Sequence, residues 1–445
     1  MEYIIRNTPC GEIEGIREEK IERFLGIPFA TAERFKYPKE VTSWEGRLQA
    51  FSYGDAPLQK DAFHQTDYLD TSDFCGHEML NGVEVKYSEK CLNLNIWAPE
   101  NAEKAPVLIV IYGGGLVAGR TNELIYDGTA FAKKGIIVVF LSYRVNIFGF
   151  LALKAMAERD GKSGNYGYYD QQIGIEWVRH NIASFGGNPE NMTLAGQSAG
   201  AASCEAQIKS PMNKGYFKQA FIQSSAGFTT VLKAKDNREK EYRKWQKIYD
   251  ASGCGSLEEF IQLPAEQLFR LFEENGGNSI GFTNVVYDEN FSSSLKNQPC
   301  DTKIIIGITS EDVMPFILYI MSALLAKNQA KGNVDTYRYL FCRQLPGDDK
   351  GAWHTSDLWY FYGNMKKCWR PFTEEDYILS EKMIEYAANF MKTGNPNSAG
   401  LTPWLPYSQS KKGFMFFDTV KGGMGKPKVI RLLKEMIFGD NIGMS

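Results

Sequence analysis

The stretch Met192-Thr193-Leu194-Ala195-Gly196-Gln197-Ser198-Ala199-Gly200 decides the fold of this chain. It begins as a short apolar strand, passes through a G-x-S-x-G turn and continues into the helix-forming residues 201–207. So tight a turn needs small residues on both sides of the serine, which explains the two glycines. Because such a turn exposes the side chain at its apex, Ser198 is a candidate nucleophile. An ordinary glycine-rich turn would use the same residues, so the motif needs support from elsewhere in the chain.

Short β-branched runs alternate with amphipathic stretches along the chain. The runs are continuously apolar, which is typical of strands in a sheet that is covered on both faces. Helices are predicted over 170–185 and 377–391, where apolar residues recur at helical spacing. This alternation predicts an α/β fold with a mostly parallel central sheet and helices on both faces. The predicted strands are 107–111, 136–141, 192–195, 220–223, 303–306 and 337–341.

Bulk composition excludes several classes of protein. The 445 residues are 43% hydrophobic with a net charge of −3, which supports a large core and provides no basic surface for nucleic acid. No apolar run is as long as a membrane span, and the first residues lack the pattern of a signal peptide. The eight cysteines form neither C-x-x-C nor zinc spacing. We therefore expect reduced thiols, a cytoplasmic protein and no metal; the composition leaves the oligomeric state open.

Histidine is scarce, which narrows the choice of a catalytic base. In α/β-hydrolases the catalytic residues follow the order serine, acid, histidine along the chain, so the base must come after Ser198. Of the four histidines, only His354 does so; the others are His64, His77 and His180. His354 is therefore the candidate base.

The acid should follow a strand that lies between the serine and the histidine in sequence. The predicted strand 303–306 leads into Glu311 and Asp312, two adjacent carboxylates of which only one can point at His354. Composition does not choose between them.

Three consecutive glycines supply a candidate oxyanion hole. The predicted strand 107–111 runs into Tyr112-Gly113-Gly114-Gly115, where the lack of side chains permits close approach of a ligand to the backbone. The expected donors are the N–H groups of Gly114, Gly115 and Ala199. A phosphate-binding loop is the alternative, since residues 114–121 differ from that motif at one position. Arginine replaces its lysine there, and the next strand ends without a metal-binding aspartate.

Seven segments, in order, resemble the type-B carboxylesterase family, the cholinesterase-like branch of the α/β-hydrolases. They match the family's FLGIPYA, EDCLYLNI, YGGG, NYR…FGFL, GNxGxxDQ and FxxTGxPN patterns and the FGGNP that precedes the serine turn. The segments are Phe24–Ala30, Glu89–Ile96, Tyr112–Gly115, Tyr143–Leu151, Gly164–Gln171, Phe185–Pro189 and Phe390–Pro396.

The resemblance implies a single α/β-hydrolase domain over residues 1–445. A helical insertion is expected around 229–300, and a shortened cap region around 313–335, because only 42 residues separate Asp312 from His354. In the family the acid stands five residues after a strand-end glycine, which corresponds to Asp312 after Gly307. The family usually has glutamate there, so Glu311 remains the rival.

The resemblance also implies hydrolysis of small-molecule carboxylic esters through an acyl-enzyme, with Ser198, His354 and Asp312 as the triad and no cofactor. Gln197 replaces a glutamate that is frequent in the family, which weakens the case for a cationic substrate. Cys91 matches a cysteine that is paired in secreted members, and Cys75 is the conceivable partner. The alternatives are a lipase or thioesterase of the same fold, and a catalytically inactive binding protein of the kind the family also contains.

Overall fold

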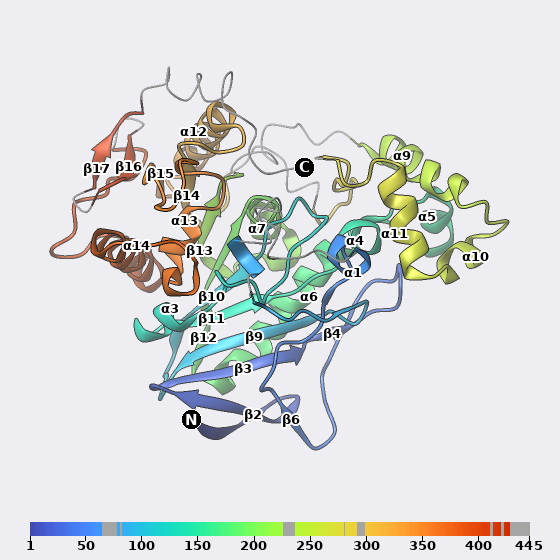
Figure 1. Cartoon of the computed structure of the whole chain (residues 1–445), viewed down its shortest axis with the longest axis horizontal. Helices are drawn as coiled ribbons and strands as arrows, with labels where there is room; N and C mark the ends of the chain where they lie inside the picture. The colour runs from blue at the N-terminus through green and yellow to red at the C-terminus, as the bar shows by residue number, and fades with distance from the viewer. Residues whose placement is uncertain are drawn as a thin grey trace.

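The described residues place thirteen strands in one sheet, around which the helices pack (Figure 1). The computed structural model describes residues 1–64, 78–80, 82–225, 236–279, 281–291, 299–409, 413–419 and 422–427. The strand order is β1-β2-β3-β9-β11-β10-β12-β13-β14-β15-β16-β17, and β6 pairs with β2.

Strands of this sheet run from the N-terminus nearly to the last described residue. Their bounds are β1 Glu2–Thr8, β2 Gly11–Glu18, β3 Ile21–Pro28, β6 Arg47–Gln49, β9 Asn93–Pro99, β10 Ala105–Ile111, β11 Ile137–Leu141, β12 Gly187–Gln197, β13 Phe217–Gln223, β14 Lys303–Thr309, β15 Thr336–Phe341, β16 Phe414–Phe417 and β17 Gly423–Gly425. Two short pairs lie outside it: β4 Ala30–Thr31 with β5 Lys39–Glu40, and β7 Ala56–Pro57 with β8 Tyr87–Ser88.

The helices connect and cover the strands. Their bounds are α1 Lys60–Phe63, α3 Thr129–Lys133, α4 Asn146–Phe150, α5 Lys154–Asp160, α6 Tyr166–Asn181, α7 Ala199–Lys209, α9 Arg238–Ala251, α10 Leu257–Gln262, α11 Ala265–Glu274, α12 Pro315–Lys331, α13 Asp357–Phe361 and α14 Glu374–Thr393. Helix α7 contacts β10, β12 and β13; α14 contacts β10 and β12; α12 contacts β14 and β15.

The centre of the sheet is parallel, as the continuous apolar runs predicted. All pairings from β11 through β10, β12, β13, β14 and β15 to β16 are parallel, whereas β1, β2, β3 and β9 pair antiparallel at one side. Residues Val107–Ile111 of β10 are all buried. The α/β-hydrolase architecture and the six predicted strands are confirmed. The antiparallel strands before residue 100 were not predicted.

The helix predicted over 170–185 is wrong in its bounds. The α-helix α6 begins four residues earlier, at Tyr166, and ends at Asn181, after which Ile182–Phe185 form a tighter 3₁₀ turn that ends at Gly186 in the left-handed conformation. The sequence pattern continues through both because the 3₁₀ turn buries Ile182 and Phe185 on the same core. The helix predicted over 377–391 is confirmed within α14.

Two intervals between strands of the sheet are helical. Between β13 and β14 the described residues form α9, α10 and α11, in the region where the helical insertion is expected. Helix α12 occupies most of the interval 313–335 and begins three residues after Asp312. Figure 1 shows α12 and the α9–α11 group on opposite sides of the helix α7.

A buried ion pair fixes the end of β11 against α6. Arg144 donates through Nε and Nη2 to the carboxylate of Asp170 at 2.8 and 2.7 Å, and its backbone N–H donates to the same group at 3.1 Å. The two side chains are 4% and 0% exposed. Because removing either partner would leave a buried charge uncompensated, this pair holds the helix in place beside the central strands.

Candidate active site

Ser198 stands at the junction of β12 and α7 in a strained backbone conformation. Its φ and ψ are 55° and −127°, a region that residues with a side chain rarely adopt. Its N–H donates to the carbonyl of Gln223 at the end of β13, at 2.9 Å. Strain of this kind costs roughly 1–3 kcal/mol and persists only where the surroundings impose it. Here the turn presents the serine at the carboxyl end of the sheet.

The two glycines of G-x-S-x-G are required by their neighbours. A Cβ on Gly196 would lie 2.4 Å from the backbone of Gly200, and a Cβ on Gly200 would lie 2.2 Å from the carbonyl oxygen of Ile111. Both distances are far inside van der Waals contact. The helix α7 therefore starts against the end of β10, which a larger residue at either position would prevent.

The largely buried His354 and the fully buried Asp312 form a pair beside this turn. His354 Nδ1 donates to Asp312 Oδ1 at 2.5 Å, and the two side chains are 16% and 0% exposed. Asp312 follows β14 and His354 precedes α13, so tertiary folding joins residues 42 positions apart. Since Nδ1 carries the hydrogen in this contact, the lone pair of the neutral imidazole is on Nε2.

The pair shifts the pKa values of both of its members. Burial alone would lower the pKa of His354, but the charge and hydrogen bond of Asp312, together with the charge of Asp357, raise it above its ordinary value. Burial alone would raise the pKa of Asp312, but His354 and the donors Ser224 and Thr309 hold it below its ordinary value. Asp312 is consequently a carboxylate at neutral pH.

Asp312 accepts three further hydrogen bonds. Ser224 Oγ and the Thr309 N–H donate to Oδ2 at 2.7 and 3.1 Å, and the Val313 N–H donates to Oδ1 at 2.9 Å. These donors fix the orientation of the carboxylate toward the imidazole.

Glu311, the rival acid, contacts other groups. It accepts from the Ala352 N–H at 2.8 Å and from Ser310 Oγ, and its own N–H donates to the Ala352 carbonyl at 3.1 Å. These contacts tie the end of β14 to the loop that carries His354. The residue after the histidine, Thr355, has a φ of 81°, so the loop is itself held in an unfavourable conformation.

The imidazole ring of His354 contacts Gln197. The Gln197 side-chain amide nitrogen lies 3.0 Å from Nε2 and 3.5 Å from Nδ1, and the side chain is 4% exposed. Within the described residues no hydrogen bond joins Ser198 Oγ to His354. Ser198 and Gln197 both lie close to Gly113. A Cβ on Gly113 would lie 3.2 Å from Ser198 Cβ and 3.1 Å from Gln197 Oε1.

The triglycine segment lies beside the serine turn with its backbone open to solvent. Gly114 and Gly115 are exposed and have φ values of 104° and 64°, and a Cβ on Gly114 would collide with the Ala118 carbonyl at 2.3 Å. Among the described groups, the N–H groups of Gly114, Gly115 and Ala199 donate to none. Ala199 is the first residue of α7, whose N-terminal N–H groups favour negative charge.

Two stacked tyrosines lie where β10 and β11 end, one of them directly before this segment. The rings of Tyr112 and Tyr143 lie 4.5 Å apart, and each hydroxyl donates to the other residue's carbonyl, at 2.7 and 3.2 Å. These contacts join the ends of β10 and β11 at the point where the triglycine segment begins.

The other histidines that the structure describes have partners of their own. His64 pairs with Glu273 and His180 with Glu40, both on the surface, and His77 and Cys75 lie outside the described residues. Cys91 is buried with a free thiol. Within the described ranges no group of three His, Cys, Asp or Glu residues could hold a metal ion, and no helix is both long and apolar enough to cross a bilayer.

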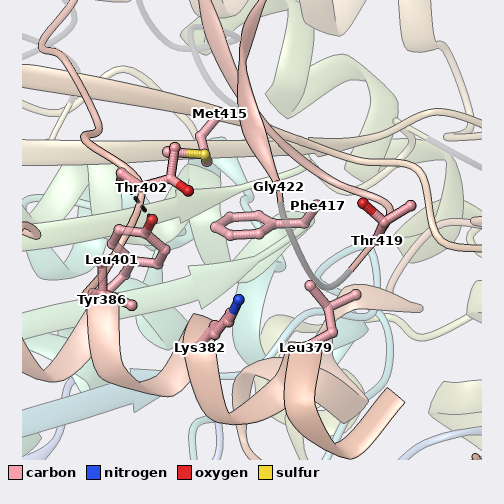
Figure 2. Close-up of a pocket in the computed structure, with 9 residues that line it drawn as sticks. All are labelled: Leu379, Lys382, Tyr386, Leu401, Thr402, Met415, Phe417, Thr419 and Gly422. Atoms are coloured by element: carbon pink, nitrogen blue, oxygen red, sulfur yellow. Dashed lines mark hydrogen bonds between the residues drawn. The ribbon is translucent and has the colours of Figure 1, made fainter. Parts of the chain in front are cut away.

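A separate pocket lies between α14 and the C-terminal strands (Figure 2). Figure 2 shows its described lining, which includes no histidine, cysteine or carboxylate; the residues are Leu379, Lys382, Tyr386, Leu401, Thr402, Met415, Phe417, Thr419 and Gly422. Its Tyr386 hydroxyl donates to the Thr402 carbonyl at 2.6 Å. The pocket contains none of the three predicted triad residues, Ser198, Asp312 and His354.

Sequence reasoning missed two residues of the site and the role of a third. Ser224, which orients Asp312, follows the predicted strand 220–223, and this strand-end position was the only signal available. Asp357 lies three residues after His354, and burial raises its pKa to about 6. The Gln197 contact with the imidazole could not be predicted, because it depends on the side-chain direction within the turn.

Comparison with known proteins identifies a family and relatives of this chain. A family model described as the carboxylesterase family matches residues 2–331 and 322–429. Acetylcholinesterase 4 of Caenorhabditis briggsae is 38% identical over 260 residues, which cover 56% of this chain and 41% of that protein. The para-nitrobenzyl esterase of Bacillus subtilis (strain 168) is 32% identical over 280 residues, or 62% of this chain and 53% of that enzyme. The matched part thus spans about half the length of these relatives or less.

A solved structure matches over nearly its full length. The crystal structure of a carboxylesterase from Geobacillus stearothermophilus superposes with a TM-score of 0.77 at 25% identity, and the match covers 97% of this chain and 99% of that one.

Proposed function

Because the chain belongs to the carboxylesterase family, we propose that it hydrolyses carboxylic esters through an acyl-enzyme formed on Ser198. The observation that carries the proposal is the buried His354–Asp312 pair, with Nδ1 and Oδ1 2.5 Å apart, beside a strained serine turn. The substrate class is a small-molecule ester, and the chemistry needs no cofactor.

In the first half-reaction Ser198 Oγ attacks the ester carbonyl carbon while its proton passes to His354 Nε2. The carbonyl oxygen takes up negative charge, which the N–H groups of Gly114, Gly115 and Ala199 stabilise. Asp312 keeps the hydrogen on Nδ1 and stabilises the imidazolium. When the carbon–oxygen bond of the leaving alcohol breaks, His354 returns the proton to that oxygen.

In the second half-reaction water replaces the alcohol. His354 Nε2 accepts a proton from the water as it attacks the acyl carbon, and then protonates Ser198 Oγ as the acid product leaves. The raised pKa of His354 favours uptake of the proton in each half-reaction.

The test compares hydrolysis of p-nitrophenyl acetate, butyrate and octanoate by the wild type and Ser198→Ala. The substitution should reduce kcat by a factor on the order of 10⁴–10⁶, as in other serine hydrolases. Retention of more than about a tenth of the wild-type rate would refute the assignment of the nucleophile. Absence of activity in both proteins would instead favour the inactive binding protein or a narrower substrate.

A further inference from the structure

We propose that Tyr339 is a positioning residue: its hydroxyl holds Asp357 as a carboxylate near His354 and thereby sets the pH above which the base is active. The inference rests on the proposed function, in which His354 is the base, and adds to it a residue outside the triad. Tyr339 contacts neither the ester nor the reacting atoms in this scheme, because it acts through Asp357 and the imidazole.

The Tyr339 ring lies over a glycine of the neighbouring strand. Gln223, Gly307 and Tyr339 stand side by side in β13, β14 and β15. A Cβ on Gly307 would come within 2.0 Å of Tyr339 Cζ and 2.2 Å of its hydroxyl oxygen. The missing side chain of Gly307 therefore leaves the space through which the phenol reaches Gln223 on the far side of β14.

Three buried side chains form a hydrogen-bonded chain at this place. Gln223 Nε2 donates to the Tyr339 hydroxyl oxygen at 2.8 Å, and the hydroxyl donates to Asp357 Oδ2 at 2.6 Å. Gln223 and Asp357 are 0% exposed and Tyr339 is 2% exposed. The direction of the second bond follows from the first, because an amide nitrogen can only donate, which leaves the hydroxyl hydrogen for the carboxylate.

Both ends of the chain are linked to the proposed triad. At one end the Gln223 carbonyl accepts the Ser198 N–H at 2.9 Å. At the other end Asp357 is the first residue of α13, three positions after His354. Burial lowers the pKa of the imidazole, whereas the charges of Asp312 and Asp357 raise it. The charge of Asp357 therefore bears directly on the base.

The charge of Asp357 depends in turn on the Tyr339 hydroxyl. Burial raises the pKa of this carboxyl to about 6, against which the hydrogen bond from Tyr339 and the charge of His354 lower it, while Asp312 raises it. Tyr362, the residue after α13, faces Asp357 and Tyr339 as a neutral phenol. Asp357 Oδ1 accepts no hydrogen bond from the described residues, so Tyr339 is the side-chain donor that favours the charged form.

Loss of the hydroxyl should shift the base in a definite direction. Without this donor the buried Asp357 takes up a proton at higher pH, so less of it is charged near neutral pH. The negative charge that stabilises the imidazolium then decreases, and His354 becomes neutral at lower pH. Tyr339→Phe should therefore lower the titration midpoint of His354 by about 0.5 pH units or more.

The test is the titration of His354, followed by NMR in histidine-labelled protein, which has only four histidines to assign. Wild type is compared with Tyr339→Phe, Asp357→Asn and the double variant. Each single change should lower the midpoint, and the double variant should match Asp357→Asn, because the charge on which Tyr339 acts is already gone. An equal further shift in the double variant overturns the proposal, as does a Tyr339→Phe midpoint within about 0.2 units of the wild type.

Two further variants control for changes in structure. Tyr337→Phe removes a hydroxyl from the same strand, where the ring packs against Phe390 and Trp404, and it should leave the midpoint unchanged; a shift equal to that of Tyr339→Phe overturns the proposal. Gln223→Met keeps the Tyr339 hydroxyl but removes the donor that directs its hydrogen, so it should also lower the midpoint. If Tyr339→Phe does not fold, Gln223→Met decides, and an unchanged midpoint overturns the proposal.

The acidic limb of kcat/KM should move together with the NMR midpoint in each variant. Because the titration uses the free protein, the two hypotheses fail separately. Midpoint shifts without any ester hydrolysis contradict only the proposed function, whereas Ser198-dependent hydrolysis with unchanged midpoints contradicts only this inference.

Discussion

The assignment of the acid to Asp312 leads to a sharp comparison between two neighbouring carboxylates. The Asp312 carboxylate accepts four hydrogen bonds: one each from His354 Nδ1 and Val313 N–H at Oδ1, and one each from Ser224 Oγ and Thr309 N–H at Oδ2. Asp312→Asn replaces one of these oxygens by a donor, so one pair of donors loses its acceptor in either orientation of the amide.

Both orientations are costly. With the amide nitrogen at the Oδ2 position, the buried Thr309 N–H is unpaired, which costs about 1–3 kcal/mol, and the negative charge beside the imidazolium is lost. With the nitrogen at the Oδ1 position, it faces His354 and forces the ring hydrogen onto Nε2, so the ring cannot act as base. We expect kcat to fall by a factor on the order of 10⁴, the loss that the same change causes in another serine hydrolase.

Glu311→Gln is the matched control, because it is also an acid-to-amide change at the adjacent residue. Glu311 contacts Ala352 and Ser310 rather than the imidazole, and Oε1 of a glutamine can still accept from the Ala352 N–H. Its kcat should fall less than about tenfold. The assay is p-nitrophenyl butyrate hydrolysis at saturating substrate, with thermal melts to verify folding. A larger loss from Glu311→Gln than from Asp312→Asn would transfer the role to Glu311 and refute this reasoning.

The geometry leads to three further predictions. kcat/KM should rise with pH through an apparent pKa above about 6.5, because His354 acts as base only when neutral and its pKa is raised; a flat pH–rate profile from pH 5 to 9 would contradict this. Asp357→Asn removes a negative charge that raises the pKa of His354, so the acidic limb of the kcat/KM profile should move to lower pH. Movement of this limb to higher pH would show that the charge of Asp357 does not raise the pKa of His354. Gly200→Ala should abolish soluble, active protein, because the new Cβ would lie 2.2 Å from the Ile111 carbonyl oxygen. The control Gly255→Ala should keep the melting temperature of the wild type, because its Cβ would meet only Glu259, at 3.5 Å.

Much of the fold was predictable because its signals are local. Buried parallel strands need continuous apolar runs, and the runs at 107–111 and 303–306 lie within β10 and β14. The bounds of α6 were not predictable, because the 3₁₀ turn that follows it continues the same apolar face. The antiparallel strands near the N-terminus have mixed burial, so their pattern is weaker than that of the buried strands.

The residues of the candidate site were likewise predictable only in part. Scarcity singled out His354, since chain order left one eligible histidine, whereas the glycines around Ser198 made it a candidate that needed support from the rest of the chain. Composition could not choose between Glu311 and Asp312, because the two adjacent carboxylates differ mainly in the direction in which their side chains point. In the folded chain Asp312 lies against the imidazole and Glu311 against the loop that carries it.

By itself, then, the sequence determined the class of the fold, the family and the serine turn, because these depend on residue type and on spacing along the chain. Tertiary structure alone decided which side chains meet: Ser224 with Asp312, Asp357 near His354, and Gln197 against the imidazole ring. The physical reason is that hydrogen bonds and pKa values depend on distances of a few ångströms between strand ends. Those distances are set by packing of the sheet and its helices, which no local pattern records.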